Sequence, residues 1–239
     1  MNENLVIIPT YNEINNIEFI INKITSLNIE IDILVVDDNS PDKTYEKVEF
    51  LKKSISNLYL IINNKKSGIG KAYIKGFEFA ISKNYSKIIQ IDADMSHDPN
   101  DIPRLLKSSK DCDLVIGSRY INGIRIINWP LSRLALSYFA NLYAKILTGL
   151  NIYDCTGGYK CIDINLLKSI NLNNINSQGY SFQIEINYRA YIKNFKIKEI
   201  PIIFTDRTIG KSKMSKRIII EAIFIVPILR LKKILKLIK

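Results

Sequence analysis

Short apolar runs alternate with segments of helical periodicity along the first half of the chain. The runs predict strands at residues 5–8, 31–36, 58–62, 88–91 and 113–117. Between the runs, apolar residues recur at helical spacing, as in Ile14, Ile17, Ile21 and Ile24. Each predicted strand is apolar almost throughout, so we expect it to be buried on both faces, as in a parallel sheet. The pattern therefore predicts an α/β fold with a mostly parallel sheet and helices on both faces.

The regular alternation of strands and helices does not continue in the second half of the chain. The periodicity predicts a strand at residues 197–204 and helices at residues 133–147, 178–194 and 217–239. Residues 154–160 are expected to form a tight polar turn, and Pro227 is expected to kink the last helix. The glycines and prolines are too scattered to form a flexible linker. We expect one large domain over residues 1–213 and a helical segment over residues 214–239.

The net charge of +11 is concentrated near the carboxyl end of the chain. Residues 207–239 contain ten Lys or Arg and a single acid, Glu221, whereas the rest of the chain is nearly neutral. A nucleic-acid-binding protein is expected to spread positive charge over a folded face, so this distribution argues against a nucleic-acid partner. A basic, amphipathic end instead favours contact with an anionic surface.

The basic segment is too short in apolar sequence to cross a membrane. Its longest apolar run, residues 222–229, falls well below the roughly 20 residues that a spanning helix needs. Two arrangements fit the pattern equally well, namely a helix that lies on a membrane surface and a helix that packs against the domain.

The cysteines and the first residues indicate the compartment. Cys112, Cys155 and Cys161 lack the paired spacing of a zinc site, so we expect reduced thiols in a reducing environment. The amino-terminal residues contain no basic region followed by a long apolar core, so we expect no secretory signal. Both features place the protein on the cytoplasmic side.

Acidic residues follow the predicted strands directly. Asp92 and Asp94 come after the run at residues 88–91, while Glu13, Asp37 and Asp38 follow two earlier strands. Ligands of α/β sheets bind at the carboxyl ends of the strands, so we expect these acids to meet there. If the chain stays extended past Asp92, Asp92 and Asp94 point to one face and can grip one hard divalent cation. A solvated turn is the alternative interpretation of this pair.

Two further features leave alternatives open. The glycine-rich loop at residues 68–71 precedes a helix, but no glycine lies five residues before Gly70, and Ala72 replaces the Ser or Thr of a Walker loop. An ATPase or a dehydrogenase is therefore disfavoured, and Lys71 either contacts phosphate or marks a plain helix start. The lone His97 is either a metal ligand or a hydrogen-bonded structural residue.

Five motifs occur in the order and approximate spacing of the polyprenyl-phosphate (dolichol-phosphate) mannosyltransferases, which the chain resembles over about residues 5–226. They are PTYNE at 9–13, VDDNSPD at 36–42, DADMSH at 92–97, GSRY at 117–120, and Asp206-Arg207 with Lys213. NWPLSR at 128–133 and GYSFQ at 179–183 favour the polyprenyl-phosphate branch of the family-two glycosyltransferases. The resemblance implies a GT-A catalytic domain over residues 1–213.

The resemblance also implies an activity and a location. It implies inverting transfer of mannose from GDP-mannose to a polyprenyl phosphate, assisted by Mg²⁺ or Mn²⁺. Because the lipid acceptor stays in the bilayer, we expect peripheral attachment at the cytoplasmic face of the membrane through the segment 214–239. Each Lys or Arg near an anionic surface contributes about 1 kcal/mol to such attachment.

The resemblance assigns roles to individual residues. It implies that Asp92, Asp94 and Arg119 are catalytic, and that Asp92, Asp94 and Ser96 hold the metal, with Ser96 standing where some relatives have Gln. The implied substrate-binding residues are Pro9, Tyr11, Glu13, Val36, Asp38, Asp92, Ala93, Asp94, Arg119, Arg133, Arg207 and Lys213.

Elementary chemistry agrees with this assignment. A lipid phosphate is already an oxyanion near neutral pH, so its attack on a sugar needs positioning rather than a strong base. Planar guanidinium groups such as those of Arg119, Arg133 and Arg207 suit bidentate binding of phosphate oxygens. The competing interpretations are a sister enzyme that moves glucose or another sugar, or uses a soluble acceptor, and a catalytically inert sugar-nucleotide binder or membrane-tethered scaffold.

Overall fold

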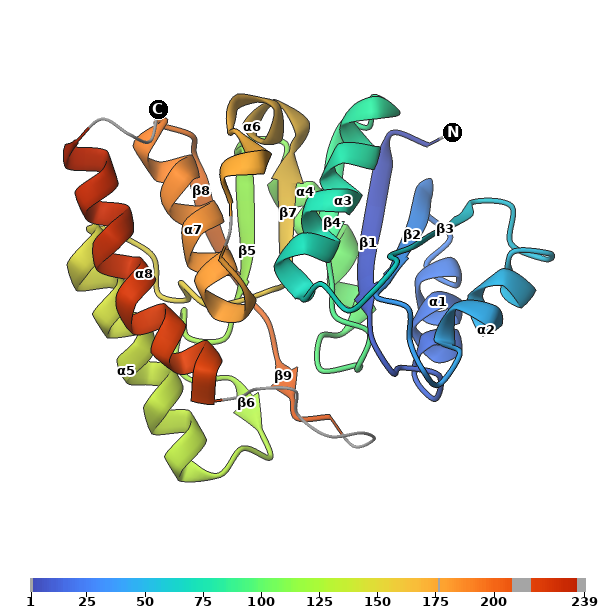
Figure 1. Ribbon diagram of the computed structural model, residues 1–239, viewed down its shortest axis with the longest axis horizontal. Helices are drawn as coiled ribbons and strands as arrows, with labels where there is room; N and C mark the ends of the chain where they lie inside the picture. Colours follow the sequence, from blue (N-terminus) through green and yellow to red (C-terminus); the bar gives the residue numbers. More distant parts are fainter. Residues whose placement is uncertain (1, 176, 208–215, 236–239) are drawn as a thin grey trace.

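A central sheet with helices on both faces forms the body of the computed structural model, which describes residues 2–175, 177–207 and 216–235 (Figure 1). The strands are β1 (Asn4–Thr10), β2 (Ile31–Asp37), β3 (Leu58–Ile62), β4 (Lys87–Gln90), β5 (Leu114–Ser118), β6 (Ile126–Ile127), β7 (Lys160–Asp163), β8 (Ile197–Pro201) and β9 (Phe204–Thr205). The helices are α1 (Ile17–Thr25), α2 (Thr44–Leu51), α3 (Ile69–Ser82), α4 (Ile102–Ser108), α5 (Leu131–Thr148), α6 (Ile164–Ser169), α7 (Gly179–Ile192) and α8 (Lys216–Ile234). Short 3-10 turns occur at η1 (Pro99–Asp101) and η2 (Leu172–Asn174).

The main sheet confirms the predicted α/β class. Its strand order is β3-β2-β1-β4-β7-β5-β8, and β6 pairs with β9 in a small second sheet. All neighbours in the main sheet are parallel except β7, which runs antiparallel to both β4 and β5. The carboxyl ends of β1, β2, β4 and β5 therefore share one edge with the beginning of β7.

Alternation along the strands divides the core into two layers. In β1, Leu5 and Ile7 face the layer that contains α3, α6 and α7, whereas Val6 and Ile8 face the layer that contains α1, α2 and α4. All four side chains are fully buried. Burial on both sides explains why the strand sequences are apolar almost throughout.

Two local expectations differ from the structure. The expected polar turn at residues 154–160 leads directly into β7, a strand that we did not predict, and the short helix α6 follows it. The single strand expected at residues 197–204 is interrupted at Ile202 and Ile203, so that β8 and β9 join different sheets. β7 is short and begins with Lys160, so it lacks the local apolar signal of the other strands.

The last described helix, α8, packs against α5 and α7 at one end of the sheet (Figure 1). Its Val226 and Leu229 side chains are buried, and its backbone stays helical through Pro227. The Tyr143 hydroxyl of α5 donates a hydrogen bond to the Ile223 carbonyl oxygen at 2.7 Å. Within the described residues, none of the helices has the length and apolar content needed to span a bilayer.

Candidate functional site

A cavity of about 340 Å³ opens at the carboxyl edge of the sheet. Its volume lies in the range of small-molecule binding sites. The cavity is lined by residues from strand ends and from the loops that follow them, and they are Pro9, Thr10, Tyr11, Glu13, Asp38, Lys66, Gly68, Ile69, Ala72, Asp92, Ala93, Asp94, Ser96, His97, Arg119, Trp129, Arg133, Thr156, Gly158, Gln178, Gly179, Tyr180, Gln183, Phe204 and Arg207.

The acidic pair does not lie on an extended strand. β4 ends at Gln90, and the chain turns at Ala93 and Asp94 before Met95 adopts a positive φ of 62°. The condition of an extended path past Asp92 is therefore not met, because the chain leaves the sheet at that point. Asp92 and Asp94 nevertheless line the same cavity, and it is the turn that brings them together.

Asp94 is paired with a cationic group. Its Oδ2 atom lies 2.7 Å from Nη2 of Arg207, and its Oδ1 atom accepts hydrogen bonds from the Ser96 hydroxyl at 2.6 Å and the Ser96 backbone N–H at 3.1 Å. Burial opposes ionisation of this carboxyl group, but the Arg207 charge and the Ser96 hydrogen bonds together lower the pKa of Asp94. Asp94 is therefore held as a carboxylate with a fixed orientation.

Asp92 lies in a different electrostatic environment. Burial, reinforced by the negative charge of Asp94, raises the pKa of Asp92 to about 7, although Arg207 acts in the opposite direction. The Tyr73 hydroxyl donates a long hydrogen bond to Oδ1 of Asp92 at 3.4 Å, and within the described residues no cation forms an ion pair with Asp92. A further positive charge in the cavity would therefore stabilise the ionised form of Asp92.

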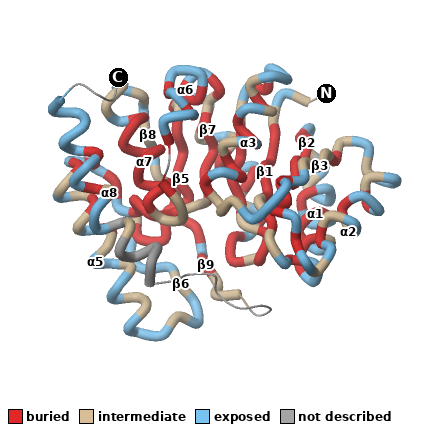
Figure 2. Tube along the Cα trace, in the orientation of Figure 1, coloured by how far each residue is buried: buried red, intermediate tan, exposed pale blue. Residues whose placement is uncertain are grey.

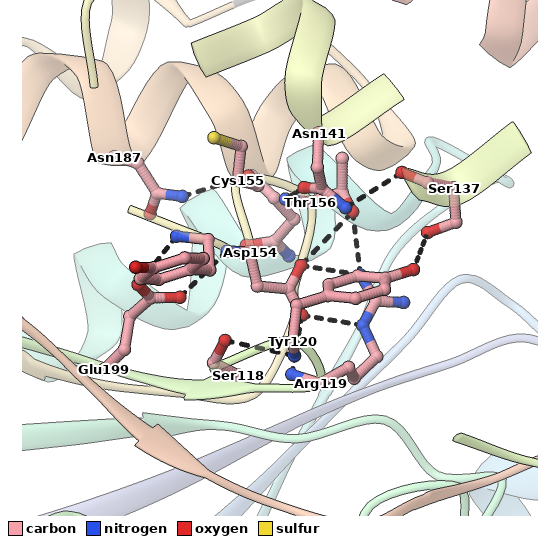
Figure 3. A network of polar contacts seen from close by, with 12 residues as sticks. Ser118, Arg119, Tyr120, Ser137, Asn141, Asp154, Cys155, Thr156, Asn187 and Glu199 are labelled. Carbon is pink, nitrogen blue, oxygen red and sulfur yellow. Dashed lines mark hydrogen bonds and ion pairs between the residues drawn. The ribbon is translucent and has the colours of Figure 1, made fainter. Parts of the chain in front are cut away.

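Arg119 makes its main contacts with Asp154. Nε of Arg119 lies 2.7 Å from Oδ2, Nη2 lies 2.7 Å from Oδ1, and Nη2 also donates to the Thr156 hydroxyl at 2.7 Å (Figure 3). Both side chains are almost completely buried. The bidentate edge of Arg119 is therefore occupied by Asp154, and the expected bidentate binding of phosphate by this edge does not fit the arrangement.

The loop that carries Asp154 is held from several directions (Figure 3). The Asp154 backbone N–H donates to Glu199 at 2.8 Å, the Thr156 N–H donates to Asn141 at 3.2 Å, and the Asn187 amide donates to the Cys155 carbonyl oxygen at 3.0 Å. These partners come from β8, α5 and α7. The loop therefore ties three elements together directly beneath the cavity.

Arg133 lies near the start of α5 and lines the cavity. Its Nη1 atom donates to both carboxylate oxygens of Asp206, at 2.9 and 2.8 Å, and its guanidinium group stacks over the Trp129 ring at 4.2 Å from the centroid. Arg133 and Arg207 thus enter the same cavity, each beside a carboxylate group.

A third group of residues lines the cavity next to the ends of β1 and β2. The ammonium group of Lys66 lies 4.1 Å from the centroid of the Tyr11 ring. Asp38 accepts hydrogen bonds from the backbone N–H groups of Ser67 at 2.9 Å and Gly68 at 2.8 Å, so it fixes the loop before α3. The glycine-rich loop at residues 68–71 therefore lies against the cavity through Gly68, whose φ of 91° favours glycine.

His97 is packed between aromatic rings. Its ring centroid lies 5.0 Å from that of Tyr159 and 5.2 Å from that of Phe204. Burial lowers the pKa of His97 to about 4, so the ring is neutral near neutral pH. Its Nδ1 atom has no hydrogen-bond partner among the described residues. The aromatic contacts suit a structural residue, but the residue that carries this unpartnered Nδ1 atom also lines the cavity, so both interpretations stay open.

Ten of the predicted binding residues, together with Ser96, line the cavity. Val36 is an exception, since its side chain is fully buried in the core layer that contains α3. Lys213 lies outside the described residues. The individual roles assigned to these positions stay predictions.

Other cavity residues were not predicted as binding residues. They include Lys66, Gly158, Gln178 and Gln183. Gly158 lies just before β7, whose first residue, Lys160, pairs with Gln90 at the end of β4, and a Cβ atom on Gly158 would lie 3.8 Å from Oδ2 of Asp92. Gln183 belongs to the GYSFQ motif, and that motif was the available signal.

An α/β fold of this topology, with paired aspartates at the carboxyl edge of the sheet, is that of a GT-A glycosyltransferase. Residues 5–170 match the family model described as glycosyl transferase family 2. The chain belongs to this family, and the protein is a glycosyltransferase of family 2.

Two relatives match most of the chain. The undecaprenyl-phosphate mannosyltransferase of Micrococcus luteus is 40% identical over 92% of this chain and 90% of its own length. The polyprenol monophosphomannose synthase of Mycolicibacterium smegmatis is 42% identical over 92% of this chain and 84% of its own length.

The solved structures of glucosyl-3-phosphoglycerate synthase from Mycobacterium tuberculosis have the same fold. The complex with Mn²⁺, UDP and phosphoglyceric acid gives a TM-score of 0.70 at 16% identity, covering 97% of this chain and 78% of that chain. The complex with phosphoglyceric acid alone gives a TM-score of 0.69 at 16% identity, covering 94% and 80%. At this level of identity the likeness extends to the fold.

Proposed function

We propose that the protein transfers mannose from GDP-mannose to a polyprenyl phosphate. The observation that carries this proposal is the single cavity in which the Asp92 and Asp94 carboxylates lie with the guanidinium groups of Arg133 and Arg207. Donor and acceptor are both phosphate compounds, and such a cavity offers oxygen ligands for a cation and guanidinium groups for phosphate. The names of the Micrococcus luteus and Mycolicibacterium smegmatis relatives support mannose as the sugar and a polyprenol-type acceptor.

A divalent cation, Mg²⁺ or Mn²⁺, fits the acidic pair. Asp94 already attracts a cationic group, the pKa of Asp92 is raised beside it, and carboxylate oxygens are the ligands that hard cations prefer. Asp92 and Asp94 would hold the ion, and Ser96, whose hydroxyl orients Asp94, would complete the set. Bound there, the ion would neutralise the charge that develops on the departing diphosphate. Mn²⁺ in complexes of the similar-fold synthase supports a divalent ion.

The proposed reaction is a direct displacement. An oxygen of the acceptor phosphate forms a bond to the anomeric carbon while the bond from that carbon to the diphosphate oxygen breaks, which inverts the anomeric centre. No side chain has to act as a nucleophile, and the anionic acceptor needs no strong base. The task of the protein is to hold two anionic substrates together, which Arg133, Arg207 and Lys213 perform by binding their phosphates.

The remaining predicted residues are assigned to the donor. Pro9, Tyr11, Glu13 and Asp38 line the part of the cavity next to β1 and β2, where we place the guanosine, and Val36 supports this wall from the core. Ala93 lies between the two aspartates, where we place the diphosphate. In this assignment Arg119 acts through Asp154 and the Thr156 loop, and only its Nη1 atom is left for a substrate.

We further propose that α5 and α8 form a membrane-binding surface, here called the α5–α8 face. These neighbouring helices leave large apolar side chains exposed, and the outer parts of both are mainly accessible (Figure 2). The face consists of Leu131, Leu136, Phe139, Leu142 and Ile146 from α5 and Ile223, Phe224, Ile228, Leu231 and Ile234 from α8. Such a patch is larger than scattered surface apolar residues explain.

Charge and position favour a bilayer as the partner of the α5–α8 face. Lys232 and Lys233 are exposed at one end of α8, and positive charge beside apolar side chains matches an anionic lipid surface. Arg133, which lines the cavity, lies on α5 itself, so a lipid phosphate held at the surface would have a short path to the cavity. This docking extends the membrane contact predicted for residues 214–239, and we place it at the cytoplasmic face.

A sister activity with UDP-glucose as donor is the second candidate. It is favoured by the fold shared with glucosyl-3-phosphoglycerate synthase, whose structures include a complex with UDP-glucose. The two donors differ in both base and sugar, so a direct comparison of their consumption separates the candidates.

The proposal is tested by following sugar transfer to a polyprenyl phosphate in detergent or vesicles. We expect transfer from GDP-mannose that requires Mg²⁺ or Mn²⁺, little transfer from UDP-glucose, and at least a hundredfold loss in Asp94→Asn. Asp98→Asn is the matched control, because Asp98 caps η1 and does not line the cavity. Full activity of Asp94→Asn, or no turnover of GDP-mannose by the wild type, would contradict the proposal.

A further inference from the structure

Gln183 is a polar residue in the cavity wall that the proposed reaction has not used. It lies on α7, is 4% exposed and lines the cavity. Its Oε1 atom is buried and has no hydrogen-bond partner among the described residues. A buried amide usually has its hydrogen bonds satisfied, so an unpaired one at a cavity wall points to a ligand that supplies the missing group.

Gly158 places Gln183 close to the acidic pair. A Cβ atom on Gly158, just before β7, would lie 3.5 Å from Nε2 of Gln183 and 3.8 Å from Oδ2 of Asp92. The missing Gly158 side chain therefore leaves a shallow hollow, of about the size of a methyl group, with an amide on one side and a carboxylate on the other. This hollow belongs to the cavity, since all three residues line it.

The backbone around Gln183 is rigid. Residues 181–190 of α7 are all buried, and the ammonium group of Lys160 donates to the Gln183 carbonyl oxygen at 3.1 Å. The neighbouring Phe182 ring stacks on Tyr73 with centroids 5.9 Å apart, and the Tyr73 hydroxyl in turn contacts Asp92. The amide is thus held at a fixed place relative to Asp92, as recognition of one ligand group requires.

We propose that the Gln183 carboxamide binds hydroxyl groups of the hexose that is transferred, with the sugar ring against the hollow at Gly158. The inference rests on the proposed function, because a donor whose diphosphate lies at Asp92 and Asp94 carries its sugar directly beside them. A carboxamide can donate and accept hydrogen bonds, which suits hydroxyl groups. Rotation by half a turn exchanges its oxygen and nitrogen, so either atom can face the sugar without a change in shape.

Binding of the nucleotide with and without its sugar tests this assignment. In Gln183→Met, which keeps the volume but removes the polar atoms, we expect GDP-mannose to bind roughly threefold to tenfold more weakly in the presence of Mg²⁺. Binding of GDP should stay unchanged, because GDP lacks the hexose. Calorimetry of both ligands gives the comparison, and the full chain is used throughout.

Ser181→Ala is the matched control. Ser181 lies on the same helix and has a buried hydroxyl without a partner among the described residues, but it does not line the cavity. Its substitution should leave the binding of both GDP and GDP-mannose unchanged. Equal weakening of GDP and GDP-mannose in Gln183→Met would indicate a merely structural role and overturn the proposal, as would unchanged binding of GDP-mannose.

A second variant, Gly158→Ala, places a methyl group in the hollow. The Cβ of Gly158→Ala makes only ordinary van der Waals contacts within the protein, so the fold should tolerate it. We expect the methyl group to occupy space that the sugar needs and to weaken the binding of GDP-mannose at least threefold. The binding of GDP and the melting temperature should stay unchanged. Wild-type affinity for GDP-mannose in this variant would contradict the placement of the sugar.

The identity of the donor and the role of Gln183 are distinguished by separate measurements. If the wild type uses UDP-glucose in place of GDP-mannose, the proposed donor is wrong, and the same variants are measured with UDP and UDP-glucose to test Gln183. If the wild type binds GDP-mannose and transfers mannose while Gln183→Met behaves like the wild type, only the hexose assignment fails. If the wild type binds neither donor, both proposals fall.

Discussion

The Arg207 guanidinium lies 2.7 Å from the Asp94 carboxylate, so a side chain occupies the immediate neighbourhood of the oxygen that we assign to a metal. A bound cation and the Arg207 guanidinium would repel each other, and the cation would have to compete with Arg207 for the Asp94 carboxylate. Because the arginine is partly exposed, this contact is worth only about 1 kcal/mol after solvent screening, or roughly fivefold in binding.

We therefore expect Arg207→Gln to bind Mn²⁺ about fivefold more tightly than the wild type in the absence of donor, while mannose transfer falls. Direct titration of Mn²⁺ measures the first effect. Arg133→Gln is the control, since Arg133 pairs with Asp206 and not with Asp94. Equal or weaker metal binding in Arg207→Gln would show that the two cations do not compete.

The buried Arg119–Asp154 pair predicts a large effect on stability. In Asp154→Asn the Arg119 charge would remain buried without its partner, which costs about 3–5 kcal/mol of unfolding free energy. Urea denaturation followed by circular dichroism measures the loss. Glu49→Gln breaks the exposed pair with Lys52 and should cost less than about 1 kcal/mol. Similar midpoints for the two variants would refute the structural role of Asp154.

Lys160 makes the stability depend on pH. Burial lowers the pKa of this ammonium group from its usual value near 10.5 to about 7. Between these values the unfolded chain binds more protons than the folded one, so this residue makes the folded state more stable as the pH rises above about 7. The slope is at most about 1.4 kcal/mol per pH unit.

Lys160→Met removes this titration. We expect the variant to be more stable than the wild type at pH 6.5, where the wild type buries a charged Lys160. This difference in unfolding free energy should shrink toward pH 8.5. Comparing differences cancels the contribution of Cys161, because burial raises the pKa of its thiol in both proteins. The pKa of Cys155, which burial also raises, responds to the Lys160 charge and belongs to the measured difference. A difference independent of pH would mean that Lys160 stays protonated in the fold.

The α5–α8 face predicts binding to vesicles. Phe139 and Phe224 are each 64% exposed, so replacing both by Glu should leave the fold intact and weaken binding to anionic vesicles at least tenfold. Cosedimentation measures the bound fraction. Phe50 on α2 is equally exposed, at 63%, but lies at the other end of the sheet, and Phe50→Glu should bind like the wild type (Figure 1). Identical binding of all three proteins would exclude the α5–α8 face.

Local sequence pattern was sufficient for the elements whose burial is uniform. β1 to β5 are apolar runs between polar turns, and each one was predicted within a few residues of its observed bounds. The acids after β1, β2 and β4 could be placed at one edge, because parallel strands present their carboxyl ends together. The rule placed Glu13, Asp38, Asp92 and Asp94 together, and all four line one cavity. Asp37, which the rule also placed there, does not line the cavity and accepts hydrogen bonds from Thr10 and Ser40 instead.

Pairings between residues that are distant along the chain were not predicted by the local pattern. β7 is short, begins with a buried lysine and is recognised only through its pairing with β4 and β5. Its pairing with the end of β4 places Gly158 near Asp92, beside Gln183. No local periodicity encodes such a pairing, because it joins residues that are far apart along the chain.

Apolar periodicity and strand direction are local properties, so residue order alone was enough to predict the α/β class, the main strands and the gathering of acids at one edge. The carboxylate that each arginine meets became known only from the folded chain. Arg119 turned to Asp154, Arg133 to Asp206 and Arg207 to Asp94. The physical reason is that an ion pair depends on side-chain geometry within a few ångströms, which residue spacing along the chain does not contain.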